Sequence, residues 1–336
     1  MSKGGDPSKD GATIKATKIH KETKKVTQAS SVTPALPVIS LPITELPTAG
    51  KLEFQPSPIH VMSMNAGGPS DGKGSAKIRR EYFAGVVLDN EPEIFLIQEF
   101  RWQGIRGDVW KDTPLPDRYE YTGNMEASIM YDSKRFRLTE LSQTKLQAPL
   151  DELKRKGKVS QDFTPIARSC VRRLEIKDPL STEAFRVLVV SWHGIHSRTN
   201  EAEKKTQFRY LQIYMKELSE REEAVVLLGG DFNIRIDRIR SLVDPGEFIL
   251  YEYQPSKRRK GNIIDYFMAS PALSLTDVKY INLAEIRKLT SHDPYKVLDH
   301  DPISAVMTKK KGTNESMIPP PKISVQNTLL ATGRAN

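Results

Sequence analysis

Polar side chains that can bind metal ions or move protons stand at the ends of short apolar runs in this sequence. Glu99 directly follows IFLIQ, His193 follows VLVVSW, and Asp231 follows VVLLGG. Polar groups at strand ends can converge on one edge of a sheet, where a rigid scaffold can hold a site. We therefore expect one site that combines acids, amides and histidines. Its other members, in or beside further apolar runs, are Asn65, Asn233, Asp265, Asp299 and His300.

The elements that must position these residues are mainly strands. Apolar runs predict strands at 59–64, 93–98, 128–131, 187–192, 224–228, 263–268 and 302–307. Apolar residues at helical spacing predict helices over 77–88 and 201–221. Residues 144–165 are polar and rich in lysine, and we expect an exposed loop with a short helix there. This mixture favours β-sheet layers covered by helices.

The composition narrows the class of protein. With 38% hydrophobic and 28% charged residues among 336, the chain is neither disordered throughout nor a membrane protein. Cys170 is the only cysteine, which excludes an intramolecular disulfide and points to a reducing compartment. The amino-terminal segment lacks the apolar stretch of a secretory signal, and no apolar run reaches the ~18 residues of a membrane span. We expect an intracellular protein of the nucleus or cytoplasm.

Three regions differ in composition. Residues 1–56 are rich in Lys, Ser, Thr and Pro, and residues 309–336 are basic and contain prolines, so we expect two disordered tails. Residues 57–308 form the predicted single domain. The net charge of +9 lies mostly in the ends, because 1–50 carry +3 (7 Lys minus 4 acids) and 308–336 carry +4 (5 basic minus 1 acid). Such tails attract polyanions or simply stay solvated.

Five motifs in this order resemble those of the endonuclease/exonuclease/phosphatase superfamily. They are MSMN (62–65), IQE (97–99), GGDFN (229–233), IDYF (264–267) and LDHDPI (298–303). The resemblance covers about 57–308. It implies an α/β (α+β) fold of the deoxyribonuclease type, a four-layer α/β/β/α sandwich in which two mixed sheets pack face to face with helices outside.

The resemblance also implies a divalent metal ion. Glu99 matches the principal metal-binding carboxylate of the superfamily, with Asn65 and Asp299 nearby. Hard oxygen ligands of this kind suit Mg²⁺ or Mn²⁺. An ion there would polarise a phosphoryl oxygen and neutralise the charge that develops in the transition state.

Four further residues match the groups that handle water and phosphate. Asp231 and Asn233 match the loop that orients the attacking water and donates a hydrogen bond to the phosphate. His300 matches the catalytic histidine, and Asp265 matches the carboxylate that binds the far nitrogen of its ring and raises its basicity. Either the histidine or the aspartate could activate the water.

A second histidine helps to choose between branches of the superfamily. His193 and Glu126 match a histidine and its supporting glutamate in pancreatic-type deoxyribonucleases, although His196 fits the histidine position as well. Arg101 matches an arginine with which those enzymes contact nucleic acid, and a solvated arginine is equally compatible. The phenylalanine of GDFN favours the nuclease and deadenylase branches over the lipid and inositol phosphatases.

A basic cluster precedes the strand of Asp265. Its members, Lys257, Arg258, Arg259 and Lys260, could grip phosphates on either side of the scissile one. A nuclear-localisation signal and a solvated loop are the two other interpretations.

These features together predict a monomeric, Mg²⁺-dependent phosphodiesterase, specifically a nuclease that hydrolyses DNA or RNA by in-line attack of water. One alternative is a phosphomonoesterase, or a phosphodiesterase for lipid or inositol phosphates, on the same fold. Another is a catalytically inactive member that only binds nucleic acid. The complete acidic set argues against inactivity, because a scaffold has no need of such a costly cluster.

Overall fold

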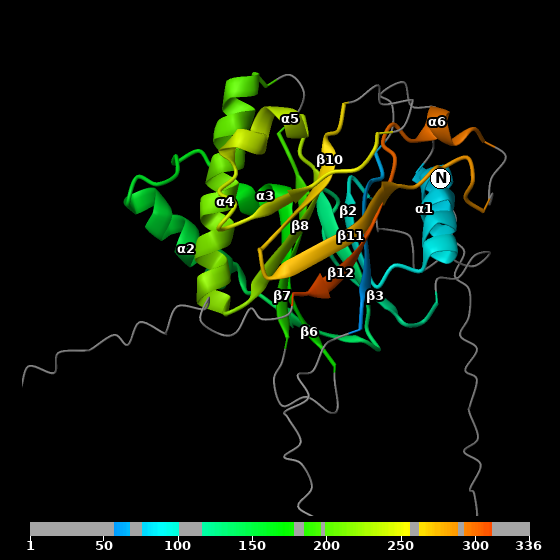
Figure 1. Cartoon of the computed structure of the whole chain (residues 1–336), viewed down its shortest axis with the longest axis horizontal. Coiled ribbons are helices and arrows are strands. Elements are labelled where there is room, and N and C mark those ends of the chain that lie inside the picture. The colour runs from blue at the N-terminus through cyan, green and yellow to red at the C-terminus, as the bar shows by residue number, and fades with distance from the viewer. Residues whose placement is uncertain are drawn as a thin grey trace, which may run out of the picture. The chain divides into compact units, whose positions relative to one another are not determined.

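Two six-stranded mixed sheets dominate the computed structural model, which describes residues 57–67, 76–100, 116–177, 185–195, 199–255, 262–287 and 292–310 (Figure 1). The first sheet has the order β11-β12-β1-β2-β4-β3, and the second has the order β5-β6-β7-β8-β10-β9. The first consists of β1 (Ile59–Asn65), β2 (Ile94–Gln98), β3 (Tyr119–Gly123), β4 (Ala127–Asp132), β11 (Leu273–Tyr280) and β12 (Ile303–Lys309). The second consists of β5 (Phe136–Glu140), β6 (Ser169–Ile176), β7 (Arg186–His193), β8 (Val225–Asp231), β9 (Ile249–Tyr251) and β10 (Asp265–Ala269).

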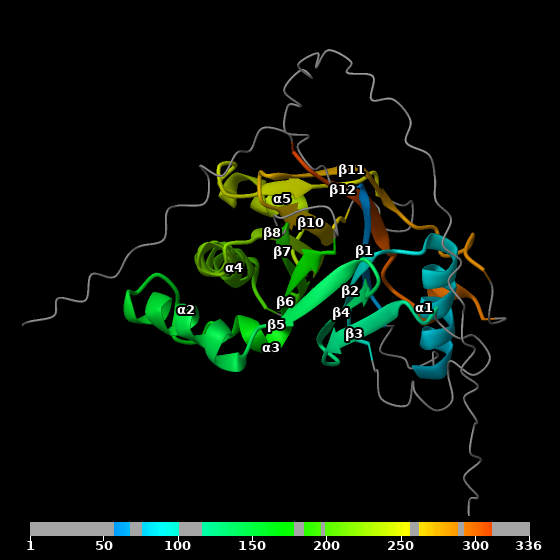
Figure 2. The same cartoon turned by 90° about the horizontal axis from the view of Figure 1, so that it is seen from below.

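Helices cover the outer face of each sheet, as Figure 2 shows. On the first sheet, α1 (Ala76–Asn90) buries Tyr82 and Phe83, and the Phe83 ring stacks on Phe95 of β2 at 5.3 Å. On the second sheet, α4 (Glu201–Glu222) buries Phe208 and Leu211. The four-layer sandwich expected from the sequence is therefore confirmed. The remaining helices are α2 (Gln143–Arg155), α3 (Pro165–Arg168), α5 (Ile236–Ile239), α6 (Pro294–Val297) and the 3₁₀ turn η2 (Arg240–Leu242).

Helix α4 begins where its sequence indicates. The side chain of Asn200 caps it by accepting the backbone N–H of Glu203 at 2.8 Å, and Glu201 and Glu203 lie in the first turn, where the helix dipole favours acids. Among the helices of the described residues, none has the length and apolarity needed to cross a membrane.

The segment 144–165 contains the helix expected there, but it is not the mainly exposed loop that the sequence predicts. Most of this segment is α2, a helix of 13 residues that Ser142 caps by accepting the backbone N–H of Lys145. Leu146, Leu150 and Leu153 are buried at helical spacing, and the carbonyl of Leu146 accepts a hydrogen bond from Tyr214 of α4. The many polar residues between these leucines form the solvent face of an amphipathic helix.

The seven predicted strands are all present, with ends shifted by a few residues, and β3, β5, β6, β9 and β11 are additional. The polar residues of β6 explain why it is hard to predict. Arg172 and Arg173 interrupt its apolar pattern, and Arg173 pairs with the buried Glu222 of α4 at 2.9 Å. The predicted boundaries of the domain at 57 and 308 remain a prediction, because the predicted tails lie almost entirely outside the described residues.

The space between the sheets changes from apolar to polar toward one end. Side chains alternate along a strand, so Val61, Ser63 and Asn65 share the inner face of β1. On β8, Gly229 and Asp231 share the inner face. A Cβ at Gly229 would lie only 2.8 Å from a methyl carbon of Leu96 on the opposite sheet, so glycine allows the sheets to approach closely here. The polar ends of these strands meet at one edge of the sandwich.

Candidate active site

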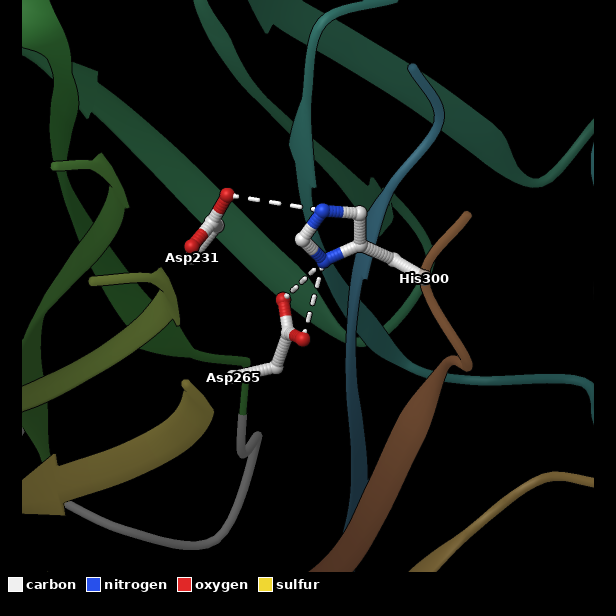
Figure 3. Close-up of side chains that lie close together, drawn as sticks. All are labelled: Asp231, Asp265 and His300. Carbon is white, nitrogen blue, oxygen red and sulfur yellow. Dashed lines mark hydrogen bonds and ion pairs between the residues drawn. The ribbon is translucent and has the colours of Figure 1, made fainter. Parts of the chain in front are cut away.

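A buried triad of side chains lies at this edge. His300 lies three residues before the start of β12, Asp265 begins β10, and Asp231 ends β8, where it is the register partner of Asp265. Nδ1 of His300 lies 2.9 and 3.0 Å from the two carboxylate oxygens of Asp265, while Nε2 faces Asp231 Oδ2 at 3.7 Å (Figure 3). An Nδ1–H that donates to Asp265 leaves Nε2 as the nitrogen available for proton transfer.

Burial raises the pKa of Asp231, which is 1% exposed, above its ordinary value. The charge of His300 opposes this shift, and the neighbouring carboxylate of Asp265 adds to it. A buried carboxyl group with a raised pKa beside a histidine is typical of groups that exchange protons in an active site. The ligand atoms of Asp231, Asp265 and His300 also lie within 4.8 Å of one another, which would allow them to hold a metal ion.

Asn65 connects this triad to Glu99. Its side-chain amide donates to Asp231 Oδ2 at 3.0 Å and to Glu99 Oε1 at 3.3 Å, so it bridges two carboxylates that would otherwise repel each other. Its oxygen accepts the backbone N–H of Gly67 at 2.8 Å. A Cβ at Gly67 would clash with Glu99 Oε2, so glycine is required for this arrangement.

Glu99 has left-handed backbone geometry, with φ of 53°. A non-glycine residue keeps this conformation only where its surroundings hold it. Here the backbone N–H groups of Glu99 and Phe100 donate to the carbonyls of Glu126 and Met125, at 3.3 and 3.0 Å. The turn after β2 therefore presents the Glu99 side chain, which is 43% exposed, to the site.

His193 lies between two glutamates. Its Nδ1 is 2.8 Å from Glu126 Oε2, and its Nε2 is 3.1 Å from Glu99 Oε1. Burial works to lower the pKa of His193, but the hydrogen bonds to the two glutamates and the charge of Asp231 outweigh burial and raise it. In return, the hydrogen bond from His193 lowers the pKa of Glu99 to about 2. The two pKa shifts are opposite in direction, and both favour an imidazolium paired with carboxylates.

The stability of the metal-free protein should depend on pH through this pair. Ionised Glu99 stabilises the fold above its ordinary pKa of 4.5, and its contribution is lost as the pH falls toward about 2. Protonated His193 stabilises the fold below pH 6.5, its ordinary pKa, and its contribution is lost as the pH rises through the raised value. Urea unfolding in the presence of a chelator should show that His193→Gln lowers the free energy of unfolding by about 1 kcal/mol more at about pH 5.5 than at about pH 9. The difference is small because solvent screens Glu99. An equal cost at both pH values would contradict the pairing.

Asn233 completes the arrangement from the loop after β8. Its backbone N–H donates to Asp231 Oδ1 at 2.8 Å, and its side-chain amide donates to Asp231 Oδ2 and to the carbonyl of Gly194, both at 3.2 Å. Its φ is 53°, a left-handed geometry that asparagine tolerates. Lys204 of α4 donates to the carbonyl of Asn233 at 2.8 Å and fixes the loop from the other side.

The structure thus joins eight of the predicted residues in one continuous chain of polar contacts: Asn65, Glu99, Glu126, His193, Asp231, Asn233, Asp265 and His300. Asp299 lies at the margin, 48% exposed and 3.7 Å from Nε2 of His300. Arg101, His196 and the cluster Lys257–Lys260 lie outside the described residues.

Arg168 is a site residue that the sequence analysis missed. Its guanidinium lies 3.2 Å from Glu126 Oε2, the oxygen that also binds His193, and donates to the carbonyl of Gly194. Since 42 residues separate Arg168 from Glu126, no spacing in the sequence reveals this contact.

Comparisons with known proteins find structures with a similar fold. No family model and no curated protein matches the chain by sequence. Among solved structures, an endonuclease/exonuclease/phosphatase family protein from Bacteroides thetaiotaomicron is similar, with a TM-score of 0.52, 16% identity, and coverage of 76% of this chain and 96% of that one. TDP2 from D. rerio, in a complex with a single-strand DNA product, has a TM-score of 0.51 and 14% identity, with coverage of 75% and 99%.

The human Nocturnin catalytic domain with a bound sulfate anion is similar to a comparable extent, with a TM-score of 0.50, 15% identity, and coverage of 75% of this chain and 95% of that one. The chain therefore has the fold of the endonuclease/exonuclease/phosphatase proteins. This confirms, at the level of the fold, the resemblance drawn from the five sequence motifs.

Proposed function

We propose that this protein is a divalent-metal-dependent phosphodiesterase, and specifically a nuclease that hydrolyses DNA or RNA by in-line attack of water. The observation that carries the proposal is the His300–Asp265 pair facing Asp231, joined through Asn65 to Glu99 in one network. Groups that can accept a proton, orient an amide donor and hold a cation meet there at one edge of a rigid sandwich.

The roles proposed for the chain's own groups follow from this geometry. Asp265 holds the His300 ring so that Nε2 faces the site, where it can hold a proton next to the phosphate. Asp231, whose raised pKa suits proton exchange, is placed to take the proton of the attacking water. The side-chain amide of Asn233, which donates to Asp231 and to the carbonyl of Gly194, would exchange one of these hydrogen bonds for one to a phosphoryl oxygen. His300 or Asp231 can serve as the base in this arrangement.

The donor set fits a hard cation, and we propose that Glu99, Asn65 and Asp299 hold Mg²⁺ or Mn²⁺. Mg²⁺ keeps several of its waters when a protein binds it through one or two carboxylates. The half-exposed side chains of Glu99 and Asp299 leave room for a hydrated ion. Asp231 and Asp265 are 1% and 4% exposed, and they already accept hydrogen bonds from other side chains of the site, so they suit a hydrated ion less. When bound, the ion would supply Lewis-acid stabilisation of charge on the phosphate.

The test is a substrate panel with Mg²⁺ and with chelator. Plasmid DNA, single-stranded DNA, RNA and bis(4-nitrophenyl) phosphate should separate a nuclease from its rivals, because a nuclease releases nucleotide fragments. Release of inorganic phosphate from monoesters would favour a phosphomonoesterase, and binding of nucleic acid without hydrolysis would favour an inactive member. Asp265→Asn protein, purified in the same way, is the control for a contaminating nuclease. Activity that persists in this variant would not belong to the site.

A further inference from the structure

A buried polar contact joins the two sheets next to the candidate site. The side-chain amide of Gln98, at the end of β2, donates to Oγ of Ser191 on β7 at 2.8 Å. Ser191 in turn donates to the backbone carbonyl of Ile97 at 3.0 Å. Gln98 and Ser191 are both 0% exposed. Because β2 and β7 belong to different sheets, these two hydrogen bonds tie the sheets together.

The contact lies directly beside two site residues. Glu99 follows Gln98 in the chain, and His193 shares a face of β7 with Ser191, two residues or about 7 Å further along. Glu99 Oε1 lies 3.1 Å from Nε2 of His193. The same two strands are therefore joined twice in succession, first by the buried hydrogen bond and then by the contact within the site.

A polar pair is unexpected at this depth, where neighbours such as Leu96 and Val189 are apolar and fully buried. Burying an amide and a hydroxyl costs free energy, which their hydrogen bond offsets only in part, because Oε1 of Gln98 has no hydrogen-bond partner among the described residues. What the pair adds is a defined distance between the two strands. Apolar side chains can repack with small shifts, whereas a buried hydrogen bond favours one separation of the groups that it joins.

We propose that Gln98 and Ser191 are positioning residues whose hydrogen bond sets the separation of β2 and β7 and thereby holds Glu99 against His193. The kinetic consequence rests on the proposed function, and the structural consequence does not. A displacement of about 1 Å in an active site can cost about 10²-fold in rate. We therefore expect Gln98→Met to lower kcat by up to about 10²-fold with little change in KM, because the loss falls on the transition state.

The chain offers a matched control. Gln98→Met keeps the length of the side chain and removes its amide, and Ser191→Ala removes the hydroxyl. Thr122→Val removes a different hydrogen bond between the sheets, from Nε of Arg172 on β6 to Oγ1 of Thr122 on β3 at 2.9 Å. This control should leave kcat unchanged. If the pair acts through its shared hydrogen bond, the double variant of Gln98 and Ser191 should lose no more activity than the less active of the two single variants.

Crystal structures of the metal-free wild type and variants give a readout that is independent of activity. The distance between Glu99 and His193 should lengthen in Gln98→Met and in Ser191→Ala, and it should stay unchanged in Thr122→Val. If Gln98→Met does not fold, Ser191→Ala alone tests the proposal. An unchanged distance in the folded variants, or an equal loss of kcat in Thr122→Val, would overturn the proposal. If the wild type hydrolyses no phosphoester but the distance still responds, the proposed function fails and the positioning role is supported.

Discussion

Chelation of divalent cations is expected to abolish hydrolysis, and Mg²⁺ or Mn²⁺ is expected to restore it. The site gathers Glu99, Asp231, Asp265 and Asp299 around two histidines, His193 and His300, and the amides of Asn65 and Asn233. This excess of carboxyl groups would repel a phosphate in the absence of a cation. Metal ions contribute several kcal/mol to charge stabilisation in such reactions, so the loss should be at least about 10²- to 10³-fold.

Two variants should separate the site of the ion from the site of proton transfer. Glu99→Gln should lower activity and raise the Mg²⁺ concentration needed for half-maximal rate, while Asp265→Asn should lower activity without changing that concentration. Titration of Mn²⁺ into each protein, followed by electron paramagnetic resonance, measures binding without relying on turnover. If Asp265→Asn weakens Mn²⁺ binding and Glu99→Gln does not, the ion belongs to the cluster of Asp231, Asp265 and His300. Full activity in excess chelator would exclude a metal-dependent mechanism.

The residues of the site could be predicted because they stand at the ends of runs that form buried strands. Asp231 follows five apolar or glycine residues that are all buried, and His193 ends another fully buried run. A strand of this kind has one possible environment, between a second sheet and a covering helix, and this constrains where its last residue lies. Strand β6, which escaped prediction, has Arg172 and Arg173 in its apolar pattern, and Arg173 pairs with Glu222 of α4, a distant part of the chain.

The contacts between these residues were harder to predict, because they depend on how two sheets pack. Gln98 and Ser191 are 93 residues apart, and nothing in either strand indicates that they meet. The left-handed backbone of Glu99 is also a tertiary feature, held by the turn before β4. Sequence patterns thus determine which residues reach the edge of the sandwich. Packing determines which nitrogen faces which oxygen.

His193→Ala is expected to reduce hydrolysis of substrates with ordinary leaving groups by about 10²- to 10⁴-fold, the usual contribution of a general acid or base. The two glutamates that raise the pKa of His193 favour its protonated form, which is the form a general acid needs. A substrate that does not require protonation of its leaving group, such as a nitrophenyl phosphodiester, should lose far less. His300→Ala should be severe with both substrates, because its proposed role is at the phosphate or the water.

The structure also makes the competing explanation specific. Because Nε2 of His193 faces Glu99 Oε1 at 3.1 Å, His193 could act only by holding Glu99 in place. In that case His193→Ala would slow both kinds of substrate equally and would raise the Mg²⁺ requirement as Glu99→Gln does. A general acid predicts a loss that depends on the leaving group, with a weaker version in Glu126→Gln and a double variant that costs less than the sum. His292→Ala, outside the site, is the histidine control and should leave both rates unchanged.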